Sequence, residues 1–404
     1  MNIAIFGQGY VGLTLSVAAA NAGHKVVGFD IDQKNIDALL VGETHVPGIE
    51  KSILNKIIDT GRFLPTTKFS DVNGAEILII AVPTPLDVNR NPDLSFLLEV
   101  TKLISEKFEG DALLINESTS YPGTLRNLIK PLIEKKNGLV FKYASAPERV
   151  DPGNEDWNLR NTTRVICGLD KESTDAAISF YSTFCDKIYE APSVEVAEAS
   201  KIFENTFRQI NIALVNEFSN IAGNLGFSAH DAIKAASTKP FGFMPFYPSV
   251  GVGGHCIPVD PTYLSFISEK HGVKAKFIEL ANQTNSSMAK IVADRIRIEL
   301  GGSLKDKKIQ IAGIAYKPEV SDMREAPSLN FISELESLGA QVFWHDPLVK
   351  EFFGKKSVPL DPSVSLGLII TPHDQIDFSI WQNAGTKVLD LSANSKNYGW
   401  PKFL

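Results

Sequence analysis

The sequence predicts an α/β protein in which two Rossmann-like, doubly wound parallel-sheet domains are joined by a helical middle domain containing one long helix. A strand, a glycine turn, a helix and a second strand follow one another within the first thirty residues. A proline-free helical pattern runs from Glu195 to about Leu225, and the alternation of strands and helices restarts after Gly301-Gly302. Because 404 residues exceed one ordinary core, we expect three domains, with boundaries at 1–190, 191–300 and 301–404.

The amino-terminal domain is predicted from apolar runs of strand length. Asn2 to Phe6 is an apolar run that ends at Gly7, and the small-residue stretch from Tyr10 to Ala22 is typical of a helix. Lys25 to Asp30 then reads as a second strand, which completes a βαβ unit. Such continuous apolar runs are typical of parallel strands buried on both faces. Further strands are expected at Glu76–Val82, Ala112–Asn116, Phe141–Ala146 and Arg164–Cys167.

The rest of the chain is divided by a long irregular stretch. Helical segments run from Glu195 to about Leu300, interrupted by residues 238–260, which are too rich in proline and glycine for regular structure. An irregular loop of this length inside a compact protein is usually functional. The elements of the last domain are expected at Lys308–Ala315, Ser328–Leu338, Gln341–His345 and Gly367–Ile370.

Composition and charge exclude several classes of function. Hydrophobic residues make up 44% and charged residues 22% of the chain, as in a soluble globular protein. A formal net charge of -7 without a long basic run argues against a nucleic-acid partner. The three cysteines are an odd number in a long chain, so we expect reduced thiols in a cytoplasmic protein rather than a disulfide framework. We expect no membrane segment and no metal site.

A dinucleotide-binding fingerprint stands between the first predicted strand and helix. Gly7, Gly9 and Gly12 have the spacing G-x-G-x-x-G, which lets backbone N–H groups and a helix N-terminus approach a pyrophosphate. Asp30 ends the next strand, where it would accept hydrogen bonds from the ribose hydroxyls and repel a 2′-phosphate. The sequence therefore predicts NAD rather than NADP. The alternative is a tight turn in a fold that binds something else.

Two further loops follow predicted strands. They are Pro83-Thr84-Pro85 and Glu117-Ser118-Thr119. In open α/β sheets ligands bind outside the carboxyl ends of the strands, so both loops should face the cofactor. The alternative is that prolines and hydroxyl side chains simply form loops.

The irregular stretch carries a candidate nucleophile, Cys256, whose small neighbours leave its sulfur approachable and backbone amides free to stabilise an oxyanion. A lone cysteine is more often a small buried apolar residue, and Cys167 and Cys185 fit that description. His255 invites a Cys–His dyad, although such partners are usually distant in sequence. Asp260 could orient water or take a proton.

The long helix carries a polar stripe. Lys201, Asn205 and Arg208 fall at i, i+4 and i+7, beside the apolar Ile202, Phe203 and Phe207. A solvated face would explain them in most helices. The apolar flank suggests instead an interior cleft, in which ammonium and amide groups could hold a developing oxyanion.

Seven motifs are spread along the chain: G-Q-G-Y-V-G-L at Gly7–Leu13, V-P-T-P at Val82–Pro85, E-S-T at Glu117–Thr119, P-E-R-V-D-P-G at Pro147–Gly153, S-K-x-x-E-N at Ser200–Asn205, G-V-G-G-H-C-I-P-V-D-P at Gly251–Pro261 and G-I-A-Y-K-P with D-x-R-E at Gly313–Glu325. Together they resemble the UDP-glucose/GDP-mannose dehydrogenase family over essentially the full length. The resemblance implies that NAD is used twice per substrate. The primary alcohol of a sugar becomes an aldehyde, Cys256 captures it as a thiohemiacetal, and a second hydride transfer leaves a thioester that water hydrolyses.

The resemblance also implies the roles of other catalytic residues. Lys201 and Asn205 would stabilise the oxyanions. Asp260 and Thr119 would hold the catalytic water or assist proton transfer, and Glu148 would be the base in hydrolysis.

The resemblance further implies binding residues and partners. Lys317 would meet the phosphates of a UDP-sugar substrate, and Arg324 the cofactor. The middle domain would form a homodimer, and the last domain would hold the nucleotide. The implied cofactor-binding residues are Gly7, Gly9, Tyr10, Val11, Gly12, Asp30, Pro83, Thr84, Thr119 and Arg324. The implied substrate-binding residues are Glu148, Arg149, Val150, Lys201, Asn205, Arg208, Gly253 and Lys317.

Substrate choice depends on departures from the UDP-glucose pattern of this family. His255 stands where that branch has serine or tyrosine, and Val259 stands before Asp260 where it has lysine. Arg149 replaces its phenylalanine, and Pro152 replaces its second acidic residue. These changes resemble the branch that oxidises UDP-N-acetylhexosamines for surface polysaccharide precursors. The loop P-F-G-F-M-P-F-Y-P favours UDP-N-acetylglucosamine over UDP-N-acetylmannosamine, and UDP-glucose 6-dehydrogenase is the alternative.

Two other classes of protein are weighed against this hypothesis. A β-hydroxyacid dehydrogenase also joins an NAD fold to a helical domain with a catalytic lysine, but it performs one two-electron oxidation and needs no thiol. A nucleotide-sensing scaffold that lost its chemistry would lack the cysteine or the lysine, and this chain has both Cys256 and Lys201.

Overall fold

The structure, a computed structural model, describes residues 1–44, 46, 48–135, 140–150, 156–394 and 396–404. Within it the chain forms two compact units. The first comprises Met1–Glu204 and Thr262–Gly272, and the second Asn205–Pro261 and Val273–Leu404. The predicted fold class is confirmed, because each unit contains a sheet of the doubly wound kind and long helices lie between the two sheets in sequence.

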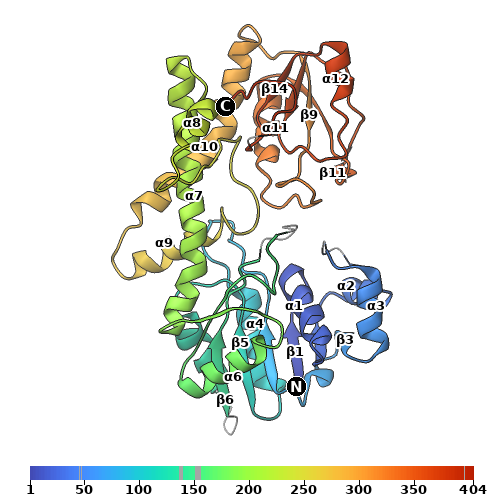
Figure 1. Ribbon diagram of the computed structural model, residues 1–404, viewed down its shortest axis with the longest axis vertical. Helices are drawn as coiled ribbons and strands as arrows, with labels where there is room; N and C mark the ends of the chain where they lie inside the picture. The colour runs from blue at the N-terminus through green and yellow to red at the C-terminus, as the bar shows by residue number, and fades with distance from the viewer. Residues whose placement is uncertain (45, 47, 136–139, 151–155, 395) are drawn as a thin grey trace. The chain divides into compact units, whose positions relative to one another are not determined.

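The first unit is built on an eight-stranded sheet with the order β3-β2-β1-β4-β5-β6-β7-β8 (Figure 1). The order reverses between β1 and β4, and doubly wound sheets bind ligands at such a switch point, outside the carboxyl ends of the strands. The strands are β1 (Asn2–Phe6), β2 (Lys25–Phe29), β3 (Phe63–Thr66), β4 (Ile77–Ile80), β5 (Ala112–Asn116), β6 (Phe141–Ser145), β7 (Arg164–Gly168) and β8 (Ile188–Glu190).

Helices cover both faces of this sheet. The connections β1 to β2 and β4 to β5 run in opposite directions across it, and right-handed crossovers then place α1 and α4 on opposite faces. Leu13 and Leu15 of α1 pack into an apolar core with Ile3 and Ile5 of β1. The helical elements are α1 (Tyr10–Asn21), α2 (Gln33–Leu40), α3 (Lys51–Asp59), η1 (Phe69–Val72), α4 (Ser95–Lys107), η2 (Leu125–Ile129), α5 (Lys130–Ile133) and α6 (Lys171–Tyr181).

One strand pair departs from the predicted parallel arrangement. β6 and β7 are antiparallel, with Ser145 opposite Cys167. A parallel pair needs a crossover connection, usually a helix. The described residues between the two strands contain no helix, so the chain returns along the sheet in the opposite direction.

The predicted long helix is α7 (Val194–Leu225), drawn in green in Figure 1. In the second unit a hydrogen bond between two asparagine side chains joins it to α10 (Lys276–Glu299). Asn216 Nδ2 donates to Asn285 Oδ1 at 2.9 Å, and Asn216 Oδ1 accepts from the backbone N of Ser249 at 2.9 Å. The second bond fixes part of the irregular stretch, residues 237–259, which connects α8 (Ala229–Ala236) to α9 (Asp260–Lys270).

The second unit contains a four-stranded parallel sheet with the order β10-β9-β13-β14. Its order reverses between β9 and β13, so it has a switch point of its own. Opposite crossover directions again place α11 and α12 on opposite faces. The elements are β9 (Lys308–Ala312), α11 (Pro327–Ser337), β10 (Gln341–His345), the hairpin β11 (Glu351–Phe352) and β12 (Lys355–Lys356), β13 (Leu366–Ile369), α12 (Ser379–Ala384) and β14 (Val388–Asp390).

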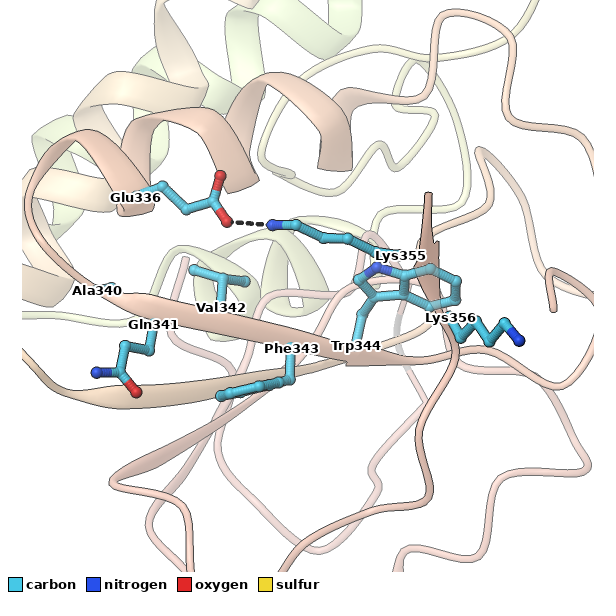
Figure 2. A pocket seen from close by; sticks show the side chains of 8 residues that line it. All are labelled: Glu336, Ala340, Gln341, Val342, Phe343, Trp344, Lys355 and Lys356. Atoms are coloured by element: carbon cyan, nitrogen blue, oxygen red, sulfur yellow. Dashed lines mark hydrogen bonds and ion pairs between the residues drawn. The ribbon is translucent and has the colours of Figure 1, made fainter. Parts of the chain in front are cut away.

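The edge strand β10 shows why this sheet ends there. Val342 and Trp344 point to one face and Phe343 to the other, as Figure 2 shows. Lys355 of the hairpin forms an ion pair with Glu336 of α11 at 2.5 Å, on the side of β10 where Val342 and Trp344 lie (Figure 2). Charged side chains beside an edge strand oppose pairing with a further strand.

Candidate active site

The first switch point has the geometry of a pyrophosphate site. A Cβ added to Gly12 would lie 1.8 Å from the carbonyl oxygen of Gly7, so only glycine lets α1 begin so close to β1. Gly9 caps α1, and no described atom outside its chain neighbours lies within 4 Å of the place its Cβ would take. Tyr10 and Val11 form the first turn and are half-buried. The N–H groups of this turn are therefore open to an anion.

Asp30 directly follows β2 and is half-buried. Its Oδ2 accepts a hydrogen bond from the backbone N of Gln8 at 2.7 Å, and its Oδ1 accepts one from the backbone N of Asp32 at 3.0 Å. The carboxylate thus holds the glycine loop while it stays near the surface. The open helix start, the small loop residues and this acid fit NAD.

The loops after β4 and β5 are tied together. Ser118 Oγ accepts from the backbone N of Val82 at 2.9 Å and donates to the carbonyl oxygen of Val82 at 2.8 Å. Thr119 is buried, Thr84 is half-buried and Pro83 is exposed. Both loops therefore lie at the same edge of the sheet as the glycine loop.

Two buried carboxylates lie beyond these loops. Glu148 Oε1 accepts from the backbone N of Arg149 at 2.6 Å and of Val150 at 2.7 Å, and Oε2 pairs with Arg164. Glu117 pairs with the same Arg164 and accepts from the hydroxyl of Tyr181. We did not predict Arg164 or Tyr181 as site residues. The signal was present, because Arg164 is a charged residue at the start of the otherwise apolar strand R-V-I-C-G.

The predicted substrate-binding Arg149 has protein partners in this structure. Its guanidinium makes two bonds to Glu204 of α7, at 2.6 and 3.2 Å, and one to the carbonyl oxygen of Thr163 at 2.8 Å. Val150 is half-buried beside it. Pro152, the position that bears on substrate class, lies outside the described residues.

The polar stripe of α7 is divided between the two units. In the first, Lys201 is half-buried, and its charge contributes to holding the pKa of Glu148 down, after the larger effect of Arg164. In the second, Asn205 Nδ2 donates to Asp260 Oδ2 at 2.6 Å, while Arg208 is exposed.

The apolar flank of that stripe is divided. Ile202 is buried, whereas Phe203 is 67% exposed and Phe207 43% exposed. The interior cleft beside the stripe therefore stays a prediction. The two phenylalanines belong to an exposed apolar face of the helix, which needs a different explanation.

Cys256 is the one exposed cysteine of the chain. Its carbonyl oxygen accepts from the backbone N of Val259 at 3.1 Å and of Asp260 at 2.8 Å, which forms the turn that leads into α9. Burial raises the pKa of the Cys185 thiol to about 11 and also raises that of Cys167. These two thiols are therefore unsuited to nucleophilic chemistry.

The cysteine loop packs against the loop that follows β9. A Cβ on Gly253 would lie 3.0 Å from Cβ of Tyr316. His255 Nε2 lies 3.1 Å from Asp322 Oδ2, and Arg324 Nη2 lies 2.7 Å from the same oxygen. His255 thus pairs with an acid of the last domain. Lys317 lies in the loop after β9, close in sequence to Tyr316.

The predicted residues therefore form two groups, each within one compact unit. The first unit holds the glycine fingerprint, Asp30, Pro83, Thr84, Thr119, Glu148, Arg149, Val150 and Lys201, and the second holds Asn205, Arg208, Gly253, Cys256, Asp260, Lys317 and Arg324.

Neither a cluster of three metal-ligating side chains nor a helix long and apolar enough to cross a membrane occurs among the described residues.

Sequence comparison finds three successive domains of one family. Residues 1–185 match the NAD binding domain of the UDP-glucose/GDP-mannose dehydrogenase family, residues 195–287 its central domain and residues 310–389 its UDP binding domain.

Individual relatives extend over most of the chain. The UDP-N-acetyl-D-mannosamine dehydrogenase of Pyrococcus horikoshii is 32% identical over 95% of this chain and 92% of its own. The UDP-N-acetyl-D-glucosamine 6-dehydrogenase of Pseudomonas aeruginosa is 32% identical over 86% of this chain and 83% of its own. The solved structure of the UDP-D-ManNAc dehydrogenase from Pyrococcus horikoshii superimposes with a TM-score of 0.88 at 30% identity, covering 100% of this chain and 97% of that one.

Proposed function

Because this chain belongs to the UDP-glucose/GDP-mannose dehydrogenase family and is an NAD-dependent nucleotide-sugar dehydrogenase, we propose that it oxidises the primary alcohol of a UDP-N-acetylhexosamine to the carboxylate. The observation that carries the proposal is Cys256, an exposed thiol on the glycine-rich loop, close in sequence to Asp260, which is bonded to Asn205. A thiol is needed only if the aldehyde is captured and oxidised again. A simple alcohol dehydrogenase has no use for it.

Each domain has a part in the proposed enzyme. Residues 1–190 bind NAD, with its pyrophosphate at the start of α1 and its ribose at Asp30. NAD, when bound, accepts the hydride of each oxidation. Residues 191–300 supply the cysteine loop and the subunit interface, and residues 301–404 hold the UDP group through Lys317.

The covalent step follows from the chemistry of the thiol. In the first oxidation the alcohol carbon loses a hydride and the hydroxyl loses a proton. Cys256 Sγ then adds to the aldehyde carbon, and the proton of the thiol goes to the carbonyl oxygen. The second hydride leaves the carbon of this thiohemiacetal, its hydroxyl loses a proton, and the product is a thioester. Water finally adds to the thioester carbon, the C–S bond breaks and the thiol is regenerated.

The remaining residues act on charge that develops in these steps. Lys201 and Asn205 donate to the oxyanions, and Asp260 orients the Asn205 amide through their 2.6 Å hydrogen bond. Thr119 and Asp260 hold the attacking water, and Glu148 takes its proton. Arg324 contacts the cofactor, as the family resemblance implies.

Two epimers of the UDP-N-acetylhexosamine are candidate substrates. The loop P-F-G-F-M-P-F-Y-P favours the gluco epimer, as in the sequence hypothesis. The manno epimer is the second candidate, because several relatives at 32–35% identity carry the name UDP-N-acetyl-D-mannosamine dehydrogenase. Arg149, His255 and Val259 favour either UDP-N-acetylhexosamine over UDP-glucose.

The test is the amount of NADH formed per substrate consumed, measured in parallel with UDP-N-acetylglucosamine, UDP-N-acetylmannosamine, UDP-glucose and GDP-mannose. We expect two equivalents with one UDP-N-acetylhexosamine. One equivalent would remove the covalent mechanism, and activity with UDP-glucose alone would show that the substrate class is wrong.

Two variants test the assigned roles. Cys256→Ser should keep NAD binding and lose net turnover, while Cys185→Ser at a buried thiol should keep turnover. Lys201→Ala should lose about 2–4 kcal/mol of transition-state stabilisation, as on removal of an oxyanion donor. A change in the Michaelis constant alone would move Lys201 from catalysis to substrate binding.

The homodimer has its own support in α7. Six apolar side chains of the helix are exposed: Val196, Phe203, Phe207, Leu214, Ile221 and Leu225. At 3.6 residues per turn they all fall within about 40° of one another around the helix axis. A stripe this narrow and this long suits pairing with a second copy of the helix. Leu214→Glu should give monomers in light scattering, and the exposed off-stripe change Asn224→Glu should not.

A further inference from the structure

Four buried side chains of the first unit form a charge cluster of which the mechanism above uses one member. Arg164 of β7 donates from Nη1 to Glu148 and from Nη2 to Glu117, and Tyr181 of α6 donates to the same Glu117 oxygen. The Arg164 guanidinium also lies over the Tyr181 ring, 4.8 Å from its centroid. Arg164 is 2% exposed and Glu117 1%. One buried guanidinium therefore serves two buried carboxylates.

The two carboxylates are held unequally. Both oxygens of Glu148 have donors, namely two backbone N–H groups on Oε1 and Arg164 on Oε2. Glu117 receives both of its donors on Oε1, and its buried Oε2 has no hydrogen-bond partner among the described residues. A buried carboxylate oxygen without a donor makes ionisation costly. Glu117 is thus the weaker anion of the pair.

The surroundings shift the pKa values of the two acids in opposite directions. Burial raises the pKa of Glu117, and the nearby charge of Arg164 does not overcome that effect. Burial would also raise the pKa of Glu148, but the charge and hydrogen bond of Arg164 outweigh it and hold that pKa below its usual range. Paired carboxyl groups whose pKa values are separated by their environment are typical of acid–base sites.

We propose that Glu117 is a positioning residue for thioester hydrolysis: it competes with Glu148 for the single guanidinium of Arg164 and so keeps the Glu148 carboxylate basic enough to activate water. This rests on the function proposed above, in which Glu148 takes the proton of the attacking water. Glu117 is enclosed by protein, so it acts through Arg164 and not on substrate. Arg164 in turn keeps both carboxylates in place.

The sign of the effect follows from the groups that face Glu148. They are Arg164 from β7, Glu117 from the end of β5, Lys201 from α7 and Cys185 from the segment after α6. In Glu117→Gln the negative charge disappears and the attraction of Arg164 acts on Glu148 alone. Both changes lower the pKa of Glu148. Glu148 then stays ionised to lower pH and is a weaker base.

The experiment isolates hydrolysis by following the covalent adduct on Cys256. Enzyme, NAD and UDP-N-acetylhexosamine are mixed at pH 8, and the decay of the thioester is measured by intact-protein mass spectrometry beside the formation of the first NADH. Glu148 is ionised at this pH in wild type and variant alike, because its pKa lies below the usual range. In Glu117→Gln the rate of thioester decay, relative to the rate of first NADH formation, should fall by roughly three- to tenfold, because Glu148 is then a weaker base.

Controls separate this effect from a loss of structure. Cys185→Ala changes a buried neighbour of the cluster that carries no charge, and its thioester should decay at the wild-type rate. Tyr181→Phe removes a donor from Glu117, which weakens Glu117 as an anion, so thioester decay should slow as in Glu117→Gln but to a smaller extent. This second variant decides the matter if Glu117→Gln does not fold.

Each outcome has one meaning. A relative rate of thioester decay that stays at the wild-type value in both variants, with thermal unfolding unchanged, overturns the role of Glu117. One NADH per substrate in wild type instead overturns the proposed function, and this is seen before a variant is made.

Discussion

The two switch points of the molecule use the same device. In the first sheet Asp30, after β2, accepts from the backbone N of Gln8 in the loop after β1. In the second sheet Asp346, after β10, accepts from the backbone N atoms of Ile314 and Ala315 in the loop after β9, at 2.9 and 3.2 Å. In both cases the acid after the second strand of a βαβ unit fixes the loop after the first. The two ends of the chain are thus related as a pseudo-repeat.

The two aspartates differ in how exposed they are and in how many hydrogen bonds they accept from the protein. Asp30 is half-buried and shares its loop with the open Gly9. Asp346 is 1% exposed, and it also accepts from Leu348 and Val349 and lies 3.1 Å from His373 Nε2. The carboxylate of Asp30 therefore stays partly accessible, which supports its proposed contact with a ribose. The carboxylate of Asp346 is fully used within the protein, which is in line with the proposal that Lys317 of the neighbouring loop contacts the UDP group.

The largest expected effect tests how closely the backbone at Gly313, in the loop after β9, approaches Thr371. Gly313 has φ +76°, and a Cβ there would lie 1.6 Å from the carbonyl oxygen of Thr371. Gly313→Ala should therefore destabilise the second unit by more than about 4 kcal/mol, measured by urea unfolding. Gly9→Ala is the matched change at the open position. It should alter the free energy of unfolding by less than about 1 kcal/mol while it weakens NAD binding, and equal losses in both variants would contradict the comparison.

The second prediction concerns the two aspartates directly. Asp346→Asn places an amide NH2 group against the N–H donors of Ile314 or Leu348 and should cost about 3 kcal/mol of unfolding free energy. Asp30→Asn should cost about 1 kcal/mol or less, because water reaches that side chain. Chemical denaturation of both variants at pH 7 measures the difference. If Asp30→Asn were as costly as Asp346→Asn, the first acid would be structural too.

The sequence predicted the first switch point better than the second, for a physical reason. The glycines of a pyrophosphate site have a fixed spacing and can be recognised in one segment, as Gly7 to Gly12 were. Strands β3, β8 and β14 were missed because they are only three or four residues long. Arg164 and Asp322 were missed for another reason, since only the fold brings Arg164 to two glutamates and Asp322 to His255.

The third prediction is that the two units respond to pH in opposite directions. Glu198 of α7 accepts from the backbone N of Gly123 at 2.6 Å and of Leu125 at 2.8 Å, and burial raises its pKa to about 7. An acid whose pKa is raised in the folded state destabilises the fold as the pH rises from its unfolded pKa through 7. The pKa of Asp346 is held low, despite its burial, by His373 and backbone N–H groups, so its contribution is lost only as pH falls through its folded pKa.

Unfolding at pH 5 and pH 8 measures this contrast. Between pH 5 and pH 8 the free energy of unfolding of Glu198→Gln should rise by about 2–3 kcal/mol relative to that of wild type, because the penalty of ionising Glu198 is absent. The amide leaves one backbone donor worse satisfied at both pH values, so only the change with pH is diagnostic. Asp346→Asn should instead lose the stability that wild type gains between pH 2 and pH 5. Parallel pH curves for wild type and both variants would refute the prediction.

The smallest expected effect is on cofactor choice at Asp30. Asp30→Asn keeps an acceptor for the backbone N of Gln8 but loses the charge that strengthens a bond to a ribose hydroxyl and repels a 2′-phosphate. The Michaelis constant for NAD should rise about tenfold, equivalent to about 1.4 kcal/mol, and NADP should become a measurable oxidant with kcat for NAD little changed. Asp32→Asn is the control, because Asp32 caps α2 by accepting from the backbone N of Lys34 and asparagine caps a helix equally well. An Asp30→Asn enzyme with wild-type preference for NAD would mean that the first acid, like Asp346, serves only its own loop.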